Sequence, residues 1–433
     1  MSKNHITDPS EAPGFSTHRS AATSDPSTAQ HISANVQLIP LPRPTSSTTG
    51  AQYIGPAWQR MYDLSRTHQI ETNGHADYLS PTVSKYREDS LKPPNPEFPV
   101  YKFAVALLPD LAPPTDSSDP HPSESVLFDD LTAEAVVGTA SAVLPQKENT
   151  YTSHINVFVD PERRRHRIGT AALAKLRAFL RTHDRTQAET WPTTSATSAN
   201  DGSQRVTPRL GVGTLAADHP TVHFLRANGF GLEMVEKASQ LNLDTFKGRL
   251  VSGAITQPKA DQNLEIVTYK NEIVHNITAE FIAAINAFNA DHPQSDSATP
   301  YTTTAEQYTQ SLHDSIDRGF EHRGVFIRER KSGRIVATTE VYFRSASRVA
   351  AQADTWVHAE YRGRGLATLA KIELYRELLV RDPRLTRVAT ENAESNVGMW
   401  KVNERLGFEI VAANSHWVSV FNDDEWGPFV VAD

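Results

Sequence analysis

Residues 355–368 read Thr355-Trp356-Val357-His358-Ala359-Glu360-Tyr361-Arg362-Gly363-Arg364-Gly365-Leu366-Ala367-Thr368. The segment begins with β-branched and aromatic residues, which favour a strand, and the apolar residues after it recur at helical spacing. A basic, glycine-rich turn therefore joins a strand to a helix, where backbone N–H groups and the helix dipole favour an anion. The two glycines let a ligand approach without a Cβ in the way. An ordinary strand-turn-helix with a solvated basic loop would show the same features.

A second motif lies downstream of this turn. Thr390–Asn396 reads as a strand and its exit, and it leads into Met399–Phe408, a helix that ends in Leu-Gly-Phe. Together with Arg362–Ala367, this order resembles the two signatures of the GNAT N-acetyltransferase superfamily, whose Arg/Gln-x-x-Gly-x-Gly/Ala loop cradles the pyrophosphate of acetyl-CoA. The glycine pattern fits neither a dinucleotide fingerprint nor a P-loop. The resemblance implies an α/β (α+β) fold with a mixed, mainly antiparallel central sheet flanked by helices.

The composition of the chain limits its possible functions. At 433 residues the chain is long enough for two or three domains. The formal net charge of -8 disfavours general binding to nucleic acids or anionic membranes, and no apolar run reaches the length of a membrane span. The absence of cysteine excludes disulfides and a cysteine nucleophile and is compatible with a cytoplasmic location, and the N-terminus lacks the apolar core of a signal peptide. The 17 histidines show no metal-ligand spacing, so no metal is predicted.

The same order of predicted elements occurs twice along the chain. Arg164 falls opposite Arg362, and Phe230 falls opposite Phe408. A polar, Thr/Ser-rich stretch at about 182–208 makes the first copy longer and reads as a mobile insertion. We expect a strand to resume at Leu210–Leu215, and we infer an internal duplication of one unit. One mixed α/β pattern matched twice by chance is the alternative.

The duplication predicts how the domains are arranged along the sequence. Residues 1–33 are rich in Ser, Thr and Pro and read as a disordered tail. Residues 34–245 form a degenerate N-terminal GNAT domain, 246–262 a linker, and 263–433 a catalytic C-terminal GNAT domain. The segment Asn289–Pro293 resembles the substrate-side loop of tandem GNAT proteins related to mycothiol synthase, which supports two tandem GNAT domains.

The resemblance also implies the chemistry. The family transfers an acyl group directly from acetyl-CoA to an amine in a ternary complex, so the ammonium must lose a proton, the oxyanion needs a donor and the thiolate must be stabilised. The N–H of Val357 is the candidate oxyanion donor. The predicted acetyl-CoA-binding residues are Trp356, Val357, Arg362, Gly363, Arg364, Gly365, Leu366, Ala367, Thr368 and Asn396.

Three carboxylates are candidates for the general base. Asp354 lies three residues before the proposed oxyanion donor on the same strand, and Glu340 and Glu391 lie on neighbouring strands. Each of them is equally compatible with a solvated or salt-bridged strand end. The family usually has a Tyr as general acid where this chain has Asn403, and an amide hydrogen-bonds to a thiolate but cannot protonate it. Asn396 matches the family's pantetheine-contacting Asn and is also a suitable helix N-cap.

The first copy departs from the family at each matching position. Arg167 replaces Gly365, Asn156 stands opposite Asp354, Asp218 opposite Asn396, and Leu225 opposite Asn403. An Arg at the tight glycine position costs conformational freedom and blocks a ligand's approach to the backbone. We therefore predict a first copy that is a scaffold and a second copy that is catalytic.

These observations leave three possible functions. The first is an acetyl-CoA-dependent N-acetyltransferase that acts on the primary amine of a small molecule, as a monomer or homodimer. The second is a non-catalytic CoA-binding or regulatory tandem GNAT protein, and the third is a protein N-acetyltransferase.

Overall fold

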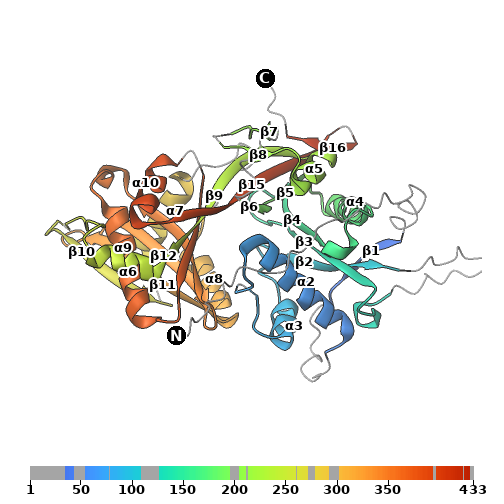
Figure 1. Ribbon diagram of the computed structural model, residues 1–433, viewed down its shortest axis with the longest axis horizontal. Coiled ribbons are helices and arrows are strands. Elements are labelled where there is room, and N and C mark those ends of the chain that lie inside the picture. Colours follow the sequence, from blue (N-terminus) through green and yellow to red (C-terminus); the bar gives the residue numbers. More distant parts are fainter. Residues whose placement is uncertain are drawn as a thin grey trace, which may run out of the picture.

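The computed structural model describes residues 35–42, 54–77, 79–108, 126–195, 204–210, 213–259, 261–271, 278–291, 302–393, 396–422 and 424–429. The predicted tail at residues 1–33 and the His292–Pro293 part of the substrate-side loop lie outside them. Two similar halves stand side by side, the first copy from β1 to β9 and the second from β10 to β16 (Figure 1).

The first copy is a sheet with helices packed on both faces. Its elements are β1 (Val36–Pro40), α2 (Pro56–Asn73), α3 (Val83–Leu91), β2 (Val100–Leu107), β3 (Val136–Val143), β4 (Thr152–Val159), α4 (Ile168–Arg181), β5 (Gln187–Thr190), β6 (Thr193–Ser195), β7 (Arg205–Val206), β8 (Leu215–Ala216), α5 (Pro220–Ala227) and β9 (Gly231–Asn242). The amphipathic helix α4 buries Ile168, Leu173 and Leu176 against this sheet, as its apolar spacing predicts.

The second copy repeats the same order. After α6 (Leu243–Val251) it comprises β10 (Leu264–Lys270), α7 (Thr278–Asp291), α8 (Ala305–Asp317), β11 (Phe320–Glu329), β12 (Ile335–Arg344), β13 (Val349–Val357), α9 (Leu366–Arg381), β14 (Arg387–Ala393), α10 (Val397–Leu406), β15 (Glu409–Asn422) and β16 (Glu425–Pro428). Gly333, with a φ of 76°, supplies the left-handed residue in the turn between β11 and β12. The mixed, mainly antiparallel sheet predicted from the sequence is confirmed in both copies.

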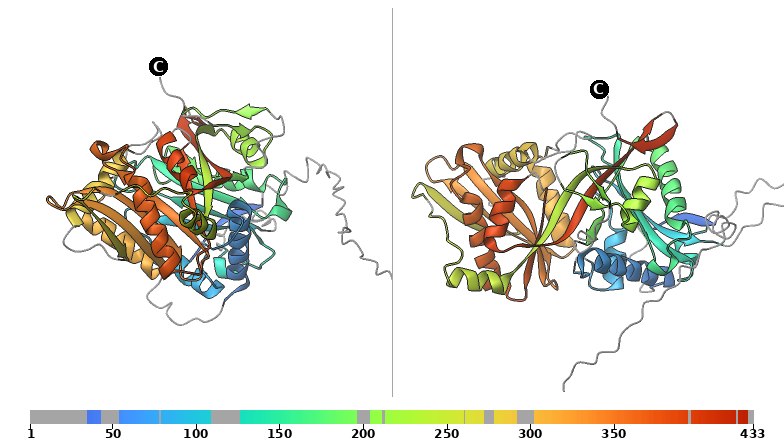
Figure 2. Two further views of the ribbon diagram at one scale, coloured as in Figure 1. Left: turned by 60° about the vertical axis from the view of Figure 1, so that its left-hand side comes forward. Right: turned by 45° about the horizontal axis from the view of Figure 1, so that its top comes forward.

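The two copies exchange their last strands. The continuous sheet runs β1-β2-β3-β4-β5-β15-β9-β14-β13-β12-β11-β10. The final strand of the second copy, β15, therefore pairs with β5 of the first copy, and β9 of the first copy pairs with β14 of the second. Both strands cross from one half to the other in all three views (Figures 1 and 2). Hydrogen bonds thus cross the predicted division at residues 246–262.

The structure corrects the prediction of a strand at Leu210–Leu215. Of the residues that the structure describes in this stretch, only Leu215 begins a strand, Leu215–Ala216, which pairs with β7 in a separate small sheet. The parallel partner of β4 is β5, Gln187–Thr190, which lies inside the stretch predicted to be a mobile insertion. This strand is hard to predict because it buries Gln187 and Glu189, which satisfy each other through a side-chain hydrogen bond of 2.7 Å. The insertion therefore follows this strand instead of preceding it.

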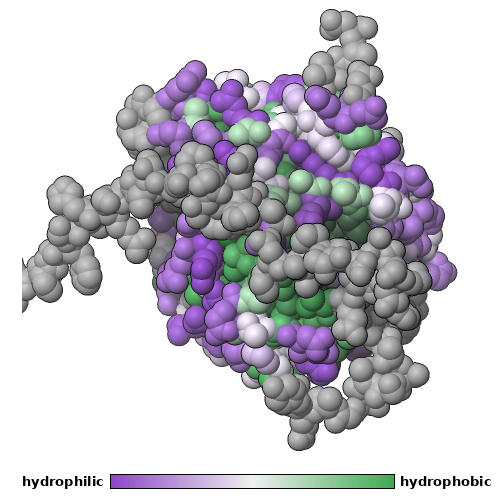
Figure 3. Space-filling view, turned by 90° about the vertical axis from the view of Figure 1, so that its right-hand side faces the viewer, coloured by the Kyte–Doolittle hydropathy of each residue, from purple (hydrophilic) through white to green (hydrophobic). Residues whose placement is uncertain are grey.

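At the end of the molecule formed by the first copy, β1 is the edge strand of the sheet among the described residues. Figure 3 faces this end and shows hydrophobic residues gathered between hydrophilic ones. Because β1 has only five residues, the edge offers few unpaired backbone groups to another chain.

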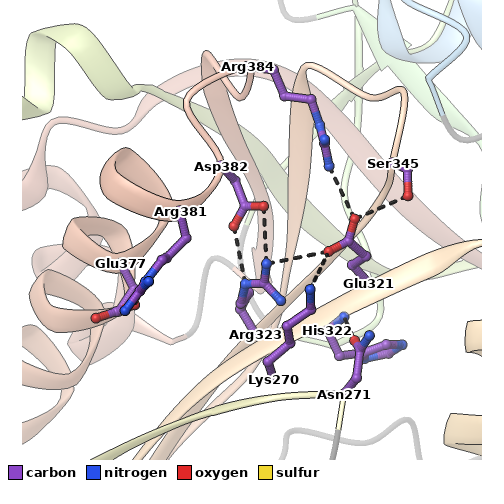
Figure 4. Close-up of polar contacts among 10 residues, drawn as sticks. All are labelled: Lys270, Asn271, Glu321, His322, Arg323, Ser345, Glu377, Arg381, Asp382 and Arg384. Atoms are coloured by element: carbon purple, nitrogen blue, oxygen red, sulfur yellow. Dashed lines mark hydrogen bonds and ion pairs between the residues drawn. The ribbon is translucent and has the colours of Figure 1, made fainter.

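A buried ion pair fixes the C-terminal end of α9 to the sheet of the second copy. Arg323 on β11 donates from Nε and from one terminal nitrogen to both oxygens of Asp382, at 3.1 Å each (Figure 4). Both side chains are less than a tenth exposed. Glu321 joins the same network and forms ion pairs with Lys270 and Arg384 on its more exposed side. The network ties the helix that follows the glycine-rich turn to a strand far from it in sequence.

We expect Arg323→Ala to lower the free energy of unfolding by roughly 3–5 kcal/mol, because Asp382 is left as an unpaired buried charge. The matched control is Arg384→Ala, which removes an exposed member of the network and is expected to cost less than about 1 kcal/mol. Denaturant unfolding at neutral pH measures both variants. Equal effects would contradict a structural role for the buried pair.

Candidate active site

The site lies where two parallel strands of the second copy part. β13 and β14 pair only over Val349–Ala351 and Arg387–Ala389. At the same level, the β12–β13 register shifts between Thr339 and Val341, a bulge that bends the strand. Beyond this point the two strands no longer pair, and a cavity of about 890 Å³ lies against their open ends.

The alternation along β13 decides which of its N–H groups face the gap. His358 N donates to Val336 O at 2.9 Å, so the N–H groups of Val357 and Thr355 point away from β12 and toward the opening. This orientation is compatible with the oxyanion role predicted for Val357. Thr355 lines the cavity and Val357 does not, so Thr355 N–H is an equivalent donor nearer to the cavity.

The glycine-rich turn has the backbone that an anion site needs. Gly363 and Gly365 have φ values of 77° and 78°, and α9 begins without a side-chain cap, so its first N–H groups are free to bind an anion. A Cβ on Gly363 would meet open space, which leaves room for a pyrophosphate. A Cβ on Gly365 would lie 2.9 Å from Pro258, so this glycine is needed for packing against the inter-copy segment.

The side chains around the turn are held by local contacts. Arg362 donates from Nε to Val357 O at 3.1 Å and pairs with Asp291 at 2.6 Å. Arg364 lies over the ring of Tyr361 and stays exposed. Trp356 is buried and donates to Asp291, and it therefore belongs to the core instead of the cavity.

The first turn of α9 holds the remaining loop residues predicted for cofactor binding. Leu366 and Thr368 are buried, so only their backbone could meet a ligand. Ala367 lies between them on the same turn. The loop as a whole therefore presents backbone N–H groups and two exposed arginines, which are the features of an anion-binding site.

The loop of the first copy has the same backbone without the glycines. Arg165 and Arg167 take φ values of 71° and 60°, at the positions that match Gly363 and Gly365. Each costs about 1 kcal/mol or more as a non-glycine residue in the left-handed region. The fold of the turn is therefore kept in the first copy, but side chains stand where the second copy leaves space.

Asp354 is the predicted base with the clearest perturbation. Its side chain lines the cavity and is exposed to it. Desolvation by the surrounding protein raises the pKa of Asp354 to about 6, and the negative charge of Glu340 adds to the shift. Glu340 itself accepts hydrogen bonds from Tyr269 at 2.9 Å and Tyr308 at 3.2 Å, and its other oxygen lies 2.7 Å from the ring of His322. With both oxygens engaged, Glu340 is poorly placed to accept a further proton.

Two more carboxylates face the cavity from neighbouring strands. Glu391 lies on β14 and Glu236 on β9, which comes from the first copy. Burial raises the pKa of Glu391. Burial and the charge of Glu391 raise the pKa of Glu236 to about 7. The walls of the cavity are therefore acidic, which favours a cationic ligand.

Asn403, predicted in place of the general acid, is fully buried and joins a polar chain. Its amide nitrogen donates to the side-chain oxygen of Asn392, and its oxygen accepts from Lys371 at 2.8 Å. Lys371 lies on α9, lines the cavity and is 1% exposed. Sequence reasoning missed this lysine, although the matching position of the first copy, Leu173, would have marked it.

Asn396 is the N-cap of α10, which is one of the two roles predicted for it. Its side chain accepts from Met399 N at 3.1 Å, and it also lines the cavity. It therefore combines the cap with a position open to a ligand.

The first copy contributes one wall of the cavity. Residues 70–75 at the end of α2, together with Trp191 and Thr193, face the open strands of the second copy. No sequence signal links these residues to the site, because only the exchange of β9 and β15 brings them there. Within the described residues no His, Asp and Glu side chains are grouped as a metal ion requires. No helix in the described segments is long and apolar enough to span a membrane.

Comparisons with known proteins bear on both copies. The family described as "Acetyltransferase (GNAT) domain" matches residues 273–409, and "Acetyltransferase (GNAT) family" matches residues 86–212. A tandem GNAT protein from the clavulanic acid biosynthesis pathway has a similar fold, with a TM-score of 0.63, 20% identity and coverage of 89% of this chain and 98% of its own.

A GCN5-related N-acetyltransferase from Sphaerobacter thermophilus has a TM-score of 0.53 and 13% identity, over 91% of this chain and 97% of its own. No curated protein sequence matches the chain significantly. At these identities the two structures establish a shared fold over nearly the whole chain.

Proposed function

This chain belongs to the GNAT acetyltransferase superfamily and carries two such domains in tandem, and we propose from this premise that it transfers the acetyl group of acetyl-CoA to the primary amine of a small molecule. The transfer is direct, in a ternary complex, and takes place in the second copy. The first copy is a scaffold that shapes the acceptor site.

One observation carries this proposal. Asp354, with its pKa raised to about 6, lines the cavity at the point where β13 and β14 part. A carboxylate of this pKa is ionised at neutral pH and is a stronger base than an ordinary Asp. It takes a proton from the acceptor's ammonium group, and the N–H groups of Thr355 and Val357 face the side on which the oxyanion would form. Glu391 remains the rival base.

The walls of the cavity favour a cationic acceptor of limited size. Glu236 and Glu391 face the same space as Asp354, and neither Glu236 nor Glu391 forms an ion pair with another described residue. A protonated amine would supply the missing positive charge. The cavity lies between the two copies, which favours a small molecule over the tail of a protein.

A thiol-release assay with acetyl-CoA and a panel of small amines tests this function. Turnover with one class of amine would support it and name the acceptor. Acetyl-CoA binding without turnover on any amine or on an amine-bearing peptide would favour a non-catalytic CoA-binding protein. Turnover on the peptide alone would favour a protein N-acetyltransferase.

Glu340 is expected to set the pKa of the base instead of acting as the base. In Glu340→Gln the pKa of Asp354 should fall below 6, because the negative charge that raises it is gone. The acid limb of kcat/KM, which rises with pH as Asp354 loses its proton, should therefore move to lower pH.

Glu391→Gln is the matched control, since Glu391 does not contribute to the shift of Asp354, and its acid limb should stay in place. A Glu340→Gln enzyme whose limb stays at the wild-type pH would contradict this assignment.

A further inference from the structure

Lys371 is a buried cation that forms no ion pair with another residue of the described segments. It lies on α9, 1% exposed, and its ammonium donates 2.8 Å to Asn403 Oδ1 and sits 5.5 Å from the ring centre of Phe408. Burial lowers its pKa to about 7, and no neighbouring charge contributes. Such a group destabilises a fold by several kcal/mol unless a polar partner offsets the loss of water. Lys371 carries this cost at a position where it lines the cavity.

The first copy shows that the fold does not need this lysine. The sixth residue of α4 is Leu173, where the sixth residue of α9 is Lys371, and Leu225 stands opposite Asn403. Both leucines are buried in one apolar core. The second copy therefore replaces an apolar pair with an ammonium and an amide at the place where β13 and β14 part.

We propose that Lys371 is the general acid of the transfer and protonates the thiol that leaves. This inference rests on the proposed function. As the bond between the acetyl carbon and sulfur breaks, its electron pair goes to sulfur, and a proton on Lys371 Nζ moves to that sulfur. Lys371, now neutral, regains a proton from solvent through the cavity, while Asp354 and water remove the protons that the amine loses. One proton is released for each amide and thiol formed.

The other groups at the cavity serve this step less well. Asn403 has no acidic proton and instead holds the ammonium, with Asn392 fixing the orientation of its amide. Of the cations that line the same cavity, Arg387 lies at the closed end, where β13 and β14 still pair, and cannot lose a proton at neutral pH. His75 lies on the wall that the first copy supplies.

The titratable groups that share the cavity with Lys371 come from several elements. They are Glu71 and His75 at the end of α2, Glu236 on β9, Tyr342 on β12, Asp354 on β13, and Arg387 and Glu391 on β14. Folding lowers the pKa of Lys371 below its unfolded value, so the penalty of its charge is greatest below about pH 7 and fades as the pH rises. Lys371→Met should therefore raise the melting temperature most at low pH, in protein without any ligand.

The kinetic experiment uses three variants in the full chain. Lys371→Met should lower kcat roughly 10²-fold with the proton donor lost, while the KM for acetyl-CoA stays within about 3-fold. Lys371→Arg keeps the positive charge but not the acidity, and it should stay slow.

Lys371→Cys introduces the only thiol, because the natural sequence has no cysteine. Aminoethylation of that thiol in the unfolded state, followed by refolding, rebuilds a lysine-like amine and should restore kcat. Lys247→Cys on the exposed face of α6, treated in the same way, is the control.

The outcomes separate this inference from the proposed function. A wild-type enzyme that turns over no amine would defeat the proposed function. A wild-type enzyme that turns over, together with a Lys371→Met enzyme of unchanged kcat, would defeat only the role of Lys371. Full activity in Lys371→Arg, or a slow aminoethylated Lys371→Cys enzyme, would also overturn it, because charge or packing would then explain the effect.

Discussion

Gly363→Glu is expected to weaken acetyl-CoA binding strongly while the protein stays folded. A Cβ added at this position has no heavy atom within 4 Å, so the glutamate has room to place its carboxylate in front of the first N–H groups of α9. A carboxylate about 4 Å from a phosphate charge costs roughly 4 kcal/mol at an effective dielectric of about 20. The Kd should therefore rise by roughly 10²–10³-fold, at about 1.4 kcal/mol for each factor of ten.

The fold of the variant should survive, because the first copy already carries Arg165 at the matching position with a φ of 71°. Gly363→Asn is the neutral control: Asn tolerates the left-handed region and adds no charge. Arg165→Glu places the same carboxylate in the first copy and should leave binding unchanged if the second copy alone holds acetyl-CoA. Titration calorimetry with acetyl-CoA measures all three. Loss of binding in Arg165→Glu but not in Gly363→Glu would reverse the roles of the two copies.

Asp354→Asn is expected to lower kcat at neutral pH by roughly 10²–10⁴-fold, the range expected for a lost general base. Acetyl-CoA affinity should stay at the wild-type value. In the wild-type enzyme, kcat/KM should rise with pH through about 6 and then level off, because the carboxylate is active only when deprotonated. In the variant this limb should disappear.

Measuring the stability of Asp354→Asn separates a loss of catalysis from a damaged fold. The pKa of Asp354 is raised on folding, so its ionised form destabilises the protein at pH values above about 6, and Asn removes that effect. A slow variant with unchanged or higher stability at pH 7 would point to lost chemistry rather than to a damaged fold. If turnover were unaffected, the base would be sought at Glu391, with Glu391→Gln as the next variant.

The sequence predicts well those parts of the fold that depend on local signals. The turn at Gly363 and Gly365, the helix α9 and the repeated order of elements follow from glycine positions and apolar spacing, which act over a few residues. The register of β5 does not, because three of its four residues are polar and the strand is placed by contacts with residues distant in sequence, such as that of Glu189 with His416. The exchange of β9 and β15 is equally invisible, since the side chains of a strand specify its buried face but not which of two similar edges it joins.

The candidate site likewise contains residues that the sequence predicts and residues that it does not. Asp354, Glu391 and Asn396 lie on the elements that carry the sequence motifs, and the structure brings them to one cavity. Glu236 and residues 70–75 reach it only through the exchanged strands. Lys371 lies on a predicted helix but in a run of apolar residues, where a lysine is ordinarily assumed to reach solvent.

The exchanged strands bear on how the protein is made. β15 occupies residues 409–422, so the sheet of the first copy lacks its inner neighbour until these residues have left the ribosome. During synthesis both β5 and β9 expose open backbone edges, at which nascent chains pair wrongly with one another. Chains that end before residue 409 should therefore collect in the insoluble fraction, although they contain every residue of the glycine-rich turn. Because β15 also lines the cavity, the cavity is complete only after this strand has been added to the sheet.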